Sequence, residues 1–468
     1  MRLVMKFGGT SVADGVKIRD VASIIRQSYE KGNEIAVVVS AMAGVTDQLE
    51  EMAKKASKNR DVTEINSFVK SLTEQHHDAA KNAIDDAKIV SSVIKELNAK
   101  IGDMSNALIS ICHLGELTDR SHDYILSFGE RLSTPILTGT LLSMKLDSSS
   151  LTGGEAGIVT NSNFKNAKPL LEITNENVKK CILPLIEKKT IPVITGFIAI
   201  DTKGVITTLG RGGSDYSASI IGAAIYADEI WIWSDVDGIM TADPRIIPEA
   251  RTLPVISYLE AMELSYFGAK VIHPKTIEPA IQRDIPVRVK NTTNPDHPGT
   301  IIVKDHEELK DIVKAVTIIK NVTLINVSGA GMVGTPGVAA RVFATLADAG
   351  VNIIMISQGS SEANLSLVID CSHLNKALSA LKSEFIENVV RNITYDEDVC
   401  SIAVVGAGMA GTPGVAGRVF SALGKVGANI RMISQGSSEV NISFVVSKKD
   451  ANTSVKALHD EFKLGEER

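Results

Sequence analysis

An internal repeat constrains the fold of this 468-residue chain more than any other feature of its sequence. The stretch "GAGMVGTPGVAARVFATLADAGVNIIMISQGSSEANLSLVI", from Gly329, aligns without gaps with "GAGMAGTPGVAGRVFSALGKVGANIRMISQGSSEVNISFVV", from Gly406. Each copy predicts a strand, a Gly-Pro turn, a helix, a strand, a short turn at "GSSE", another strand and a helix. A βαββα unit with one further strand is the arrangement of ferredoxin-like domains.

Each copy also opens with a GxGxxG pattern, which is typical of dinucleotide-binding turns. Such a site needs an acidic residue at the end of the second strand, and these strands end in Gln358 and Gln435. The pattern therefore favours a tight turn that leads into a helix. The free amide groups of this turn can also hold the carboxylate of a small ligand. Asn352 and Gln358, or Asn429 and Gln435, would then add side-chain hydrogen bonds.

The first 300 residues alternate strand-like and helix-like segments. Apolar runs such as "RLVMKF", "EIAVVVSAM", "IPVITGFIAI", "EIWIWSDV" and "IPVRVKN" are separated by helical patterns. This order predicts an α/β fold with a mainly parallel sheet covered by helices on both faces. Residues 49–114 are polar and helix-periodic, which indicates a helical insertion. The turn-rich stretch 291–299 predicts a domain boundary near residue 305.

We therefore expect three domains, at residues 1–305, 306–395 and 396–468. The second repeat ends in a helix with no strand after it, whereas "IVKAVTII" precedes the first repeat without an obvious partner. This asymmetry predicts that the two repeats exchange strands to complete their sheets.

Composition and charge exclude several classes of protein. The formal net charge of −6 argues against a general nucleic-acid binder, and no apolar run is long enough to span a membrane. The four cysteines form no CxxC pair, and "SDVDGIMTADPR" lacks the spacing of a calcium-binding loop, so no metal site is expected. Because the start of the sequence lacks the apolar core of a signal peptide, we expect a cytoplasmic protein.

Glycine-rich and charged clusters follow the predicted strands. They are Lys6–Ser11, Ser40–Thr46, Gly210–Asp215 and Ser234–Arg245. In parallel sheets, ligands bind beyond the carboxyl ends of the strands, so these clusters are candidate site residues. "KFGG" fits either phosphate binding or a plain turn, and no GxxxxGK[ST] loop is present.

"TTLGRGGSDYSA" is the most specific of these clusters. Arg211 and the amide groups at the start of a helix suit an anionic substrate or a phosphate. Asp215 can orient a lysine, cap the helix, or do both. Glu130 in "SFGERLST" and Lys270 in "FGAKVIHPKT" are ordinary charged residues unless their context shows otherwise. No pattern for a covalent nucleophile is present.

Together these motifs resemble the aspartate kinases of the amino-acid-kinase family. "KFGGTSV", "VVSAMAGVTD", "SFGERLS", "TTLGRGGSDYSA", "WSDVDGIMTADPR" and "FGAKVIHP" occur in the family's order, and the resemblance covers essentially the whole chain. The repeats are similar to ACT domains, which sense amino acids. The resemblance implies a three-layer αβα kinase domain followed by two ferredoxin-like ACT domains. With nothing after the second repeat, it also implies an enzyme with the kinase activity alone.

The resemblance implies transfer of a phosphoryl group from MgATP to the side-chain carboxylate of L-aspartate, the first step of lysine, threonine and methionine biosynthesis. Lys6 and Asp215 would be catalytic. The implied ATP contacts are Lys6, Gly8, Gly9, Ser234, Asp235, Met240, Arg245, Lys270 and Val271. The implied substrate contacts are Ser40, Thr46, Glu130, Arg211, Gly213 and Ser214. Met240 stands where the family often has tyrosine, so it keeps the apolar contact without the hydroxyl group.

The ACT resemblance implies feedback inhibition by threonine or lysine and a homodimer or tetramer assembled through the ACT domains. The implied effector residues are Gly334, Pro336, Gly337, Val338, Ala339, Asn352, Gln358, Asn429 and Gln435. Two alternatives stay open at this stage. One is another amino-acid kinase, acting on glutamate, acetylglutamate or carbamate. The other is a catalytically silent amino-acid sensor built from the same domains.

Overall fold

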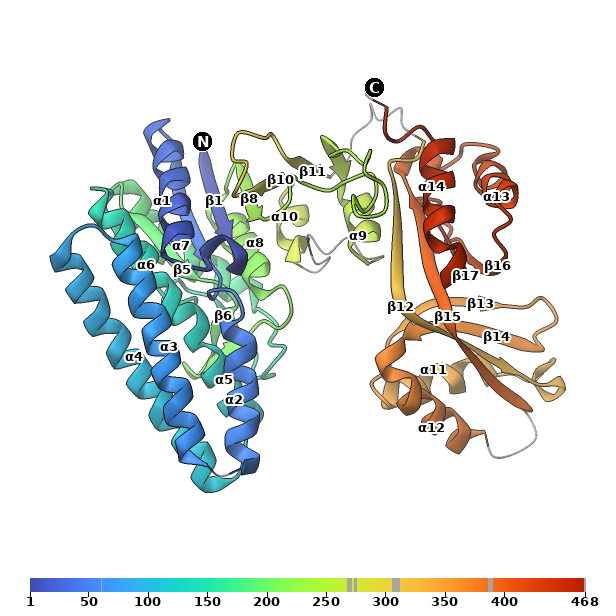
Figure 1. The fold of residues 1–468 in the computed structure, drawn as a ribbon, viewed down its shortest axis with the longest axis horizontal. Helices are drawn as coiled ribbons and strands as arrows, with labels where there is room; N and C mark the ends of the chain where they lie inside the picture. The colour runs from blue at the N-terminus through green and yellow to red at the C-terminus, as the bar shows by residue number, and fades with distance from the viewer. Residues whose placement is uncertain (60, 267–271, 273–275, 305–311, 386–389, 467–468) are drawn as a thin grey trace. The chain divides into compact units, whose positions relative to one another are not determined.

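The chain folds into two compact units. The computed structural model describes all residues except 60, 267–271, 273–275, 305–311, 386–389 and 467–468 (Figure 1). The first unit comprises Met1–Ile239, Pro254–Tyr258 and Lys270–Asp305. The second comprises Met240–Leu253, Leu259–Ala269 and His306–Arg468. The chain therefore leaves the first unit twice and returns before it enters the repeat region.

The first unit is built on an eight-stranded sheet with the order β3-β5-β2-β1-β8-β10-β11-β9. Its strands are β1 (Arg2–Phe7), β2 (Glu34–Val39), β3 (Ser148–Leu151), β5 (Ile191–Thr195), β8 (Glu229–Ser234), β9 (Val255–Ser257), β10 (Val287–Asn291) and β11 (Thr300–Val303). All neighbouring strands are parallel except β10 and β11. This arrangement confirms the mainly parallel sheet predicted from the continuous apolar runs.

Helices cover both faces of this sheet. Leu3, Met5 and Phe7 share a core with α1 (Gly15–Glu30) and α6 (Phe128–Ser143). On the opposite face, a Cβ atom at Gly222 of α8 (Gly213–Ile225) would lie 3.7 Å from Val4, so this helix packs closely on the sheet. The second face also carries α7 (Leu171–Glu187) and α10 (Glu278–Gln282). The three layers follow from the alternation of side chains along β1.

Residues 45–126 are helical apart from short connections. They form α2 (Val45–Asn59), α3 (Val62–Ala83), α4 (Ala87–Leu114) and α5 (Asp119–Leu126). Asp61 caps α3 and Asp86 caps α4 by accepting hydrogen bonds from the first amide groups of each helix. A small sheet of β4 (Val159–Thr160), β6 (Ile198–Asp201) and β7 (Ile206–Thr208) follows, and β7 leads into the glycine-rich turn before α8.

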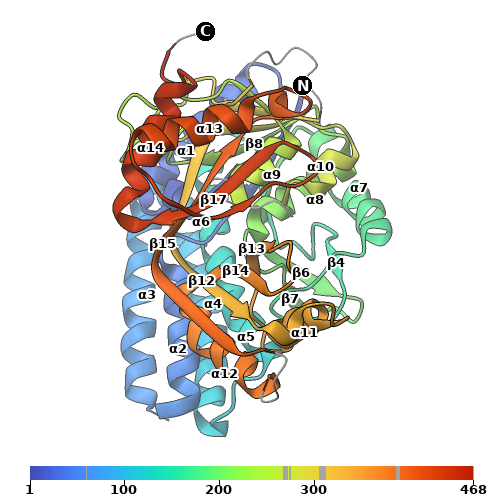
Figure 2. The same cartoon turned by 90° about the vertical axis from the view of Figure 1, so that its right-hand side faces the viewer.

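The second unit is an antiparallel sheet with the order β13-β14-β12-β15-β17-β16. Its strands are β12 (Ala315–Ser328), β13 (Ile353–Gln358), β14 (Asn364–Asp370), β15 (Asn392–Val405), β16 (Ile430–Ser434) and β17 (Asn441–Ser447). Helices α11 (Val338–Asp348) and α12 (Leu374–Glu384) share a core with β14, and α13 (Val415–Lys425) and α14 (Ala451–Glu461) share one with β17. Figures 1 and 2 show each helix pair over its own half of the sheet.

The two long strands of this sheet are shared between the repeats. Ala315–Ile319, which precedes the first repeat in the chain, pairs with Ser401–Val405 of the second repeat. Leu324–Ser328 pairs with Asn392–Asp396, which precedes the second repeat. A shift of register near Val322 separates the two halves of β12. Asn392–Asp396 follows α12 in the chain, so the first repeat completes its sheet from contiguous sequence, whereas the second repeat uses Ala315–Ile319 from before the first repeat.

Two segments from the middle of the chain also belong to the second unit. Ala242 and Ile247 lie in one apolar core with Val404 and Phe444. The part of α9 (Tyr258–Tyr266) that follows Tyr258 also belongs to the second unit. The boundary expected near residue 305 rested on local composition, which contains no signal for these long-range contacts.

A buried ion pair joins α9 to the repeats. Lys314 Nζ lies 2.9 Å from Glu260 Oε2, and the two side chains are 2% and 0% exposed. The other carboxylate oxygen of Glu260 accepts a hydrogen bond of 2.7 Å from the Ala407 amide. Desolvating two charges is costly, so this pair holds only because its geometry satisfies both groups.

We expect Lys314→Met to lower the free energy of unfolding by roughly 3–5 kcal/mol, because Glu260 would lose its bonded ammonium group while it stays buried. The double variant Lys314→Met/Glu260→Met should recover part of this loss, since apolar replacements of a buried pair are often tolerated. The measurement is the thermal unfolding midpoint. Lys180→Met is the matched control, because its pair with Glu176 is exposed and spans 3.8 Å. A single variant as stable as that control would contradict the prediction.

Candidate active site

The candidate site lies at the carboxyl ends of β1 and β2. These strands are parallel neighbours, with Lys6 opposite Val38, so the turns that follow them meet at one edge of the sheet. A Cβ atom at Gly9 would lie 2.9 Å from the Ala41 carbonyl oxygen. Glycine is therefore required where the two turns approach each other.

A second glycine-rich turn joins β7 to α8. Gly210 and Gly212 have φ angles of 74° and 72°, a left-handed conformation that glycine adopts at low cost. Gly213 begins α8, and a Cβ atom there would lie 2.7 Å from the Phe197 ring. This close approach brings the first turn of α8, which contains Asp215, to the end of β1.

Asp215 and Lys6 form an ion pair across these two turns. The Lys6 Nζ and Asp215 Oδ1 atoms are 2.5 Å apart, and the two side chains are only 11% and 13% exposed. Electrostatic attraction is stronger at such a site than in open water, so the pair fixes the position of the lysine ammonium group. The N-cap residue of α8 is Gly212, and Asp215 lies one turn inside the helix, where it orients the lysine.

Glu130 contributes a buried carboxyl group from the first turn of α6. The residue is 3% exposed, and its Oε2 atom has no hydrogen-bond partner among the described residues. Burial raises the pKa of Glu130 to about 8, although the Ala41 backbone and the charge of Lys6 act in the opposite direction. Ser133 donates a hydrogen bond of 2.8 Å to the Ser40 carbonyl, which ties α6 to the end of β2.

A cavity of about 710 Å³ collects these groups. Of the residues expected at the site, it is lined by Lys6, Gly9, Ser40, Thr46, Glu130, Arg211, Gly213, Ser214 and Asp215. The structure therefore brings together all six expected substrate contacts and both expected catalytic residues. Gly8 does not line this cavity, and a Cβ atom there would lie 3.6 Å from the Lys6 ammonium nitrogen.

Sequence reasoning missed several lining residues, among them His122, Leu126, Lys165 and Phe197. His122 and Leu126 precede Glu130 by eight and four positions, so a helical repeat of four was the available signal. His122 is 7% exposed, and its Nε2 atom lies 3.7 Å from Glu50 Oε1. Its Nδ1 atom is buried and has no hydrogen-bond partner among the described residues.

Asp123 supports the cavity wall from behind. Its carboxylate is fully buried and accepts hydrogen bonds from the Lys165 amide and from the amide and hydroxyl groups of Thr208. Thr208 ends β7, two residues before the turn that carries Arg211. A carboxylate with several donors fixes both the Lys165 loop and the start of that turn.

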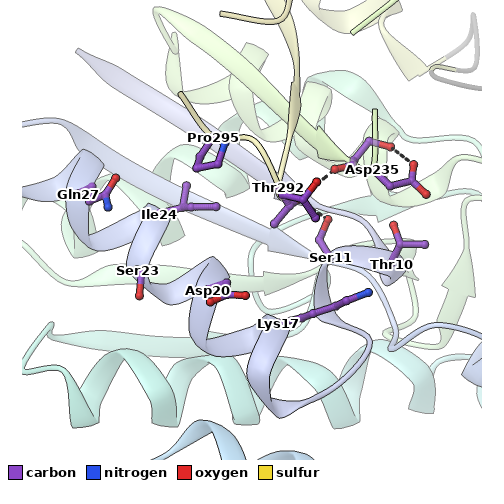
Figure 3. A pocket seen from close by; sticks show the side chains of 12 residues that line it. Thr10, Ser11, Lys17, Asp20, Ser23, Ile24, Gln27, Asp235, Thr292 and Pro295 are labelled. Atoms are coloured by element: carbon purple, nitrogen blue, oxygen red, sulfur yellow. Dashed lines mark hydrogen bonds between the residues drawn. The ribbon is translucent and has the colours of Figure 1, made fainter. Parts of the chain in front are cut away.

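Ser234 and Asp235 line a different cavity, of about 530 Å³, on the far side of the turn that follows β1. Figure 3 shows side chains of α1 facing the ends of β8 and β10 across this cavity. Ser11 and Thr292 share a hydrogen bond of 2.6 Å there, and Thr292 donates to the Ser234 carbonyl. These bonds hold the turn after β1 against its neighbours.

The remaining expected ATP contacts lie in other parts of the chain. Met240 and Arg245 belong to the second unit. Arg245 is 87% exposed at its side chain and pairs with Asp243, and Met240 forms an isolated bridge with Thr252. Lys270 and Val271 lie outside the described residues.

The glycine-rich turn of the first repeat forms a cavity of about 350 Å³. Its lining includes Gly334, Pro336, Gly337, Val338, Ala339 and Gln358, but Asn352 is not part of it. Glu362, which sequence reasoning did not single out, accepts a hydrogen bond of 3.0 Å from the Gly334 amide. The Glu362 carboxylate therefore already accepts a hydrogen bond from one of the amide groups in this turn.

The second repeat reproduces this bond. Glu439 accepts a hydrogen bond of 2.7 Å from the Gly411 amide, and both Asn429, before β16, and Gln435, after it, are exposed. In both repeats the strand after the helix runs antiparallel to its neighbour. A dinucleotide fold would have a parallel crossover there, so the topology agrees with a turn rather than a dinucleotide site.

Within the part of the chain that the structure describes, no helix is long and apolar enough to cross a bilayer. The same residues include no cluster of three or more His, Cys, Asp and Glu side chains that could hold a metal ion.

Comparisons with known proteins agree with this geometry. The amino acid kinase family model matches residues 1–291, and an ACT domain model matches residues 325–385 and 402–462. Aspartokinase 1 of Arabidopsis thaliana is 35% identical over 98% of this chain and 80% of its own length. A bifunctional aspartokinase/homoserine dehydrogenase of the same plant is 36% identical over 98% of this chain. The chain spans about half the length of such bifunctional relatives.

Solved structures give the same result. Escherichia coli aspartokinase III in complex with aspartate and ADP has a TM-score of 0.82 at 28% identity, with 98% of this chain and 99% of that chain covered. Clostridium acetobutylicum aspartate kinase has a TM-score of 0.80 at 28% identity, with 98% and 100% covered. With the family model over most of its length and aspartokinases similar over nearly all of it, this chain belongs to the amino acid kinase family, in its aspartokinase group with two ACT domains.

Proposed function

We propose that this chain transfers the γ-phosphoryl group of ATP to the side-chain carboxylate of L-aspartate, giving 4-phospho-L-aspartate and ADP. The observation that carries this proposal is the cavity in which a fixed ammonium group, an arginine and a buried carboxyl group converge. An amino acid with an acidic side chain offers the complementary charges: two carboxylates and one ammonium group. The similarity to a structure solved with aspartate and ADP supports the same assignment.

The roles follow from the charge that each group carries. Arg211 would bind the substrate α-carboxylate through its planar guanidinium group, and Glu130 would accept the substrate ammonium group. Lys6, held by Asp215, would neutralise the phosphoryl group as it transfers. Phosphoryl transfer depends mainly on positioning and charge neutralisation, so no covalent protein intermediate is needed.

Ser40, Thr46, Gly213 and Ser214 would complete the substrate cavity with hydroxyl and amide groups. Gly8 and Gly9 would supply amides to the phosphates. We also propose that ATP contacts Ser234, Asp235, Met240, Arg245, Lys270 and Val271, by the resemblance in sequence.

Mg²⁺ is the expected metal. The donor set fits an ion that arrives on the nucleotide, because Asp215 is already bonded to Lys6 and the described residues form no carboxylate cage. When bound, Mg²⁺ would neutralise charge on the phosphate oxygens.

The repeats would regulate this activity. We propose that lysine or threonine binds at the turn of the first repeat, near Gly334–Ala339 and Gln358, and that the chain forms a dimer or tetramer through its ACT domains. The structure of the Escherichia coli relative with lysine and aspartate supports an amino acid effector. Feedback also suits an enzyme at the start of lysine, threonine and methionine biosynthesis. Inhibition requires that the effector bind two conformations with different affinity.

A coupled assay of ADP release tests the proposed reaction. We expect release with aspartate and not with glutamate or without an amino acid. Lys6→Met should lower kcat roughly 10²- to 10³-fold, because one preorganised charge at the transferring group is lost. Arg211→Ala should raise the KM for aspartate by roughly 10- to 100-fold, as expected for one charged hydrogen-bonding group.

Arg19→Ala is the matched control, because that side chain pairs with Asp85 at the surface of the helical region. It should leave both constants close to those of the unaltered chain. Release that does not depend on aspartate would contradict the proposed reaction, and release driven by glutamate would favour another amino-acid kinase.

The two repeats offer a matched pair of variants for the effector site. Gln358→Ala should raise the concentration of lysine or threonine needed for half-inhibition by roughly tenfold, as expected for one lost hydrogen bond. Gln435→Ala removes the equivalent side chain in the second repeat and should change the half-inhibiting concentration less. The measurement is inhibition relative to each variant's own uninhibited rate. The opposite order would place the effector at the second repeat.

A further inference from the structure

Glu130 is an unusual group to find in the described part of the cavity, because it is buried without a counter-charge. Lys6, whose charge acts on Glu130, is already paired with Asp215. Arg131, the next residue in the chain, has its guanidinium group 4.2 Å from the centre of the Phe128 ring. No ion pair of Glu130 occurs among the described residues, and its Oε2 atom has no hydrogen-bond partner there.

An ionised carboxylate in such a place is costly, whereas a protonated one is not. The other charged groups around the cavity do not remove this cost. The α2 side contributes Asp47 and Glu50, and both carry the same charge as an ionised Glu130. The α5 side contributes His122, which lies between Glu50 and Asp123. Arg211 is exposed on the opposite turn, and Lys165 is half-exposed and pairs with Asp119.

We infer that Glu130 carries a proton while the cavity is empty and releases that proton when the ammonium group of the substrate binds. This inference rests on the proposed function, which supplies an ammonium-bearing substrate at Glu130. In the balance of the step, the neutral acid and the substrate cation become a carboxylate–ammonium pair, and one proton passes to the solvent. Substrate binding is thereby coupled to pH.

The direction of the coupling follows from linkage. Burial raises the pKa of the empty site's carboxyl to about 8, and a bound ammonium group would lower it. Below the pKa of the empty site, the carboxyl group is protonated and each binding event must displace that proton. The affinity for aspartate therefore rises with pH. The KM for aspartate should therefore fall about tenfold per pH unit between roughly pH 6 and 8 and level off above that.

Two measurements test this inference on the full chain. The first is the pH dependence of the KM for aspartate in the ADP-release assay. The second is calorimetry of aspartate binding at pH 7 in two buffers with different ionisation enthalpies, which counts the protons released. We expect close to one proton per site. A KM that does not change with pH, together with no proton release, would overturn the inference.

Variants identify the group that carries the proton. Glu130→Gln keeps the shape of the neutral acid, so it should fold normally, bind aspartate more weakly at every pH, and release no proton. His122→Gln removes a titratable group of α5 that lines the same cavity and should leave the proton release in place. If the pH dependence persists in Glu130→Gln or disappears in His122→Gln, the inference is wrong. Failure of the unaltered chain to release ADP with aspartate would instead defeat the proposed function.

Discussion

The parallel position of β1 between β2 and β8 is the constraint on which the site depends. In this register Lys6 lies beside Val38 on one side and Ile232 on the other, so the carboxyl ends of three strands meet at one edge. The turns that follow them must then fit together, and Gly9 allows this. A residue with a Cβ atom at Gly9 would push the two turns apart and separate Lys6 from the rest of the cavity.

The cost of burying a charged group explains the difference between Lys6 and Glu130 in this cavity. Lys6 is stabilised by Asp215, so its ammonium group is positioned before any ligand arrives. Glu130 lacks such a partner, and the cost of its burial is offset only by a proton or by an incoming cation. The Lys6–Asp215 ion pair and the unpaired Glu130 carboxyl group therefore have different roles. In the proposed reaction, the first would give a fixed charge for phosphoryl transfer, and the second would select a ligand that brings its own ammonium group.

Much of this could be predicted from sequence, because local patterns report local structure. Apolar runs marked β1 and β2, and the clusters at their ends held Lys6 and Ser40, while the glycine-rich cluster after β7 held Arg211. The repeat predicted the strands and helices of the second unit. Contacts between residues far apart along the chain could not be predicted from the sequence. Nothing near Glu260 indicates an ion pair with Lys314, and nothing near Met240 indicates that its segment packs with the repeats.

The path of the chain gives the proposed regulation a physical route through these distant contacts. The segment Met240–Leu253 begins just after β8 and returns just before β9, so strands of the kinase sheet are covalently continuous with residues packed in the repeat core. Tyr258, at the start of α9, donates a hydrogen bond to the Ile285 carbonyl in the first unit, while Glu260 of the same helix is bonded to Lys314 and Ala407 in the second. A rearrangement of the repeats that moved Ala407 would therefore act on α9 through a buried carboxylate, which cannot be left without its partners at low cost. Coupling by such a route requires only a few rigid bonds, and it needs no direct contact between an effector and the substrate cavity.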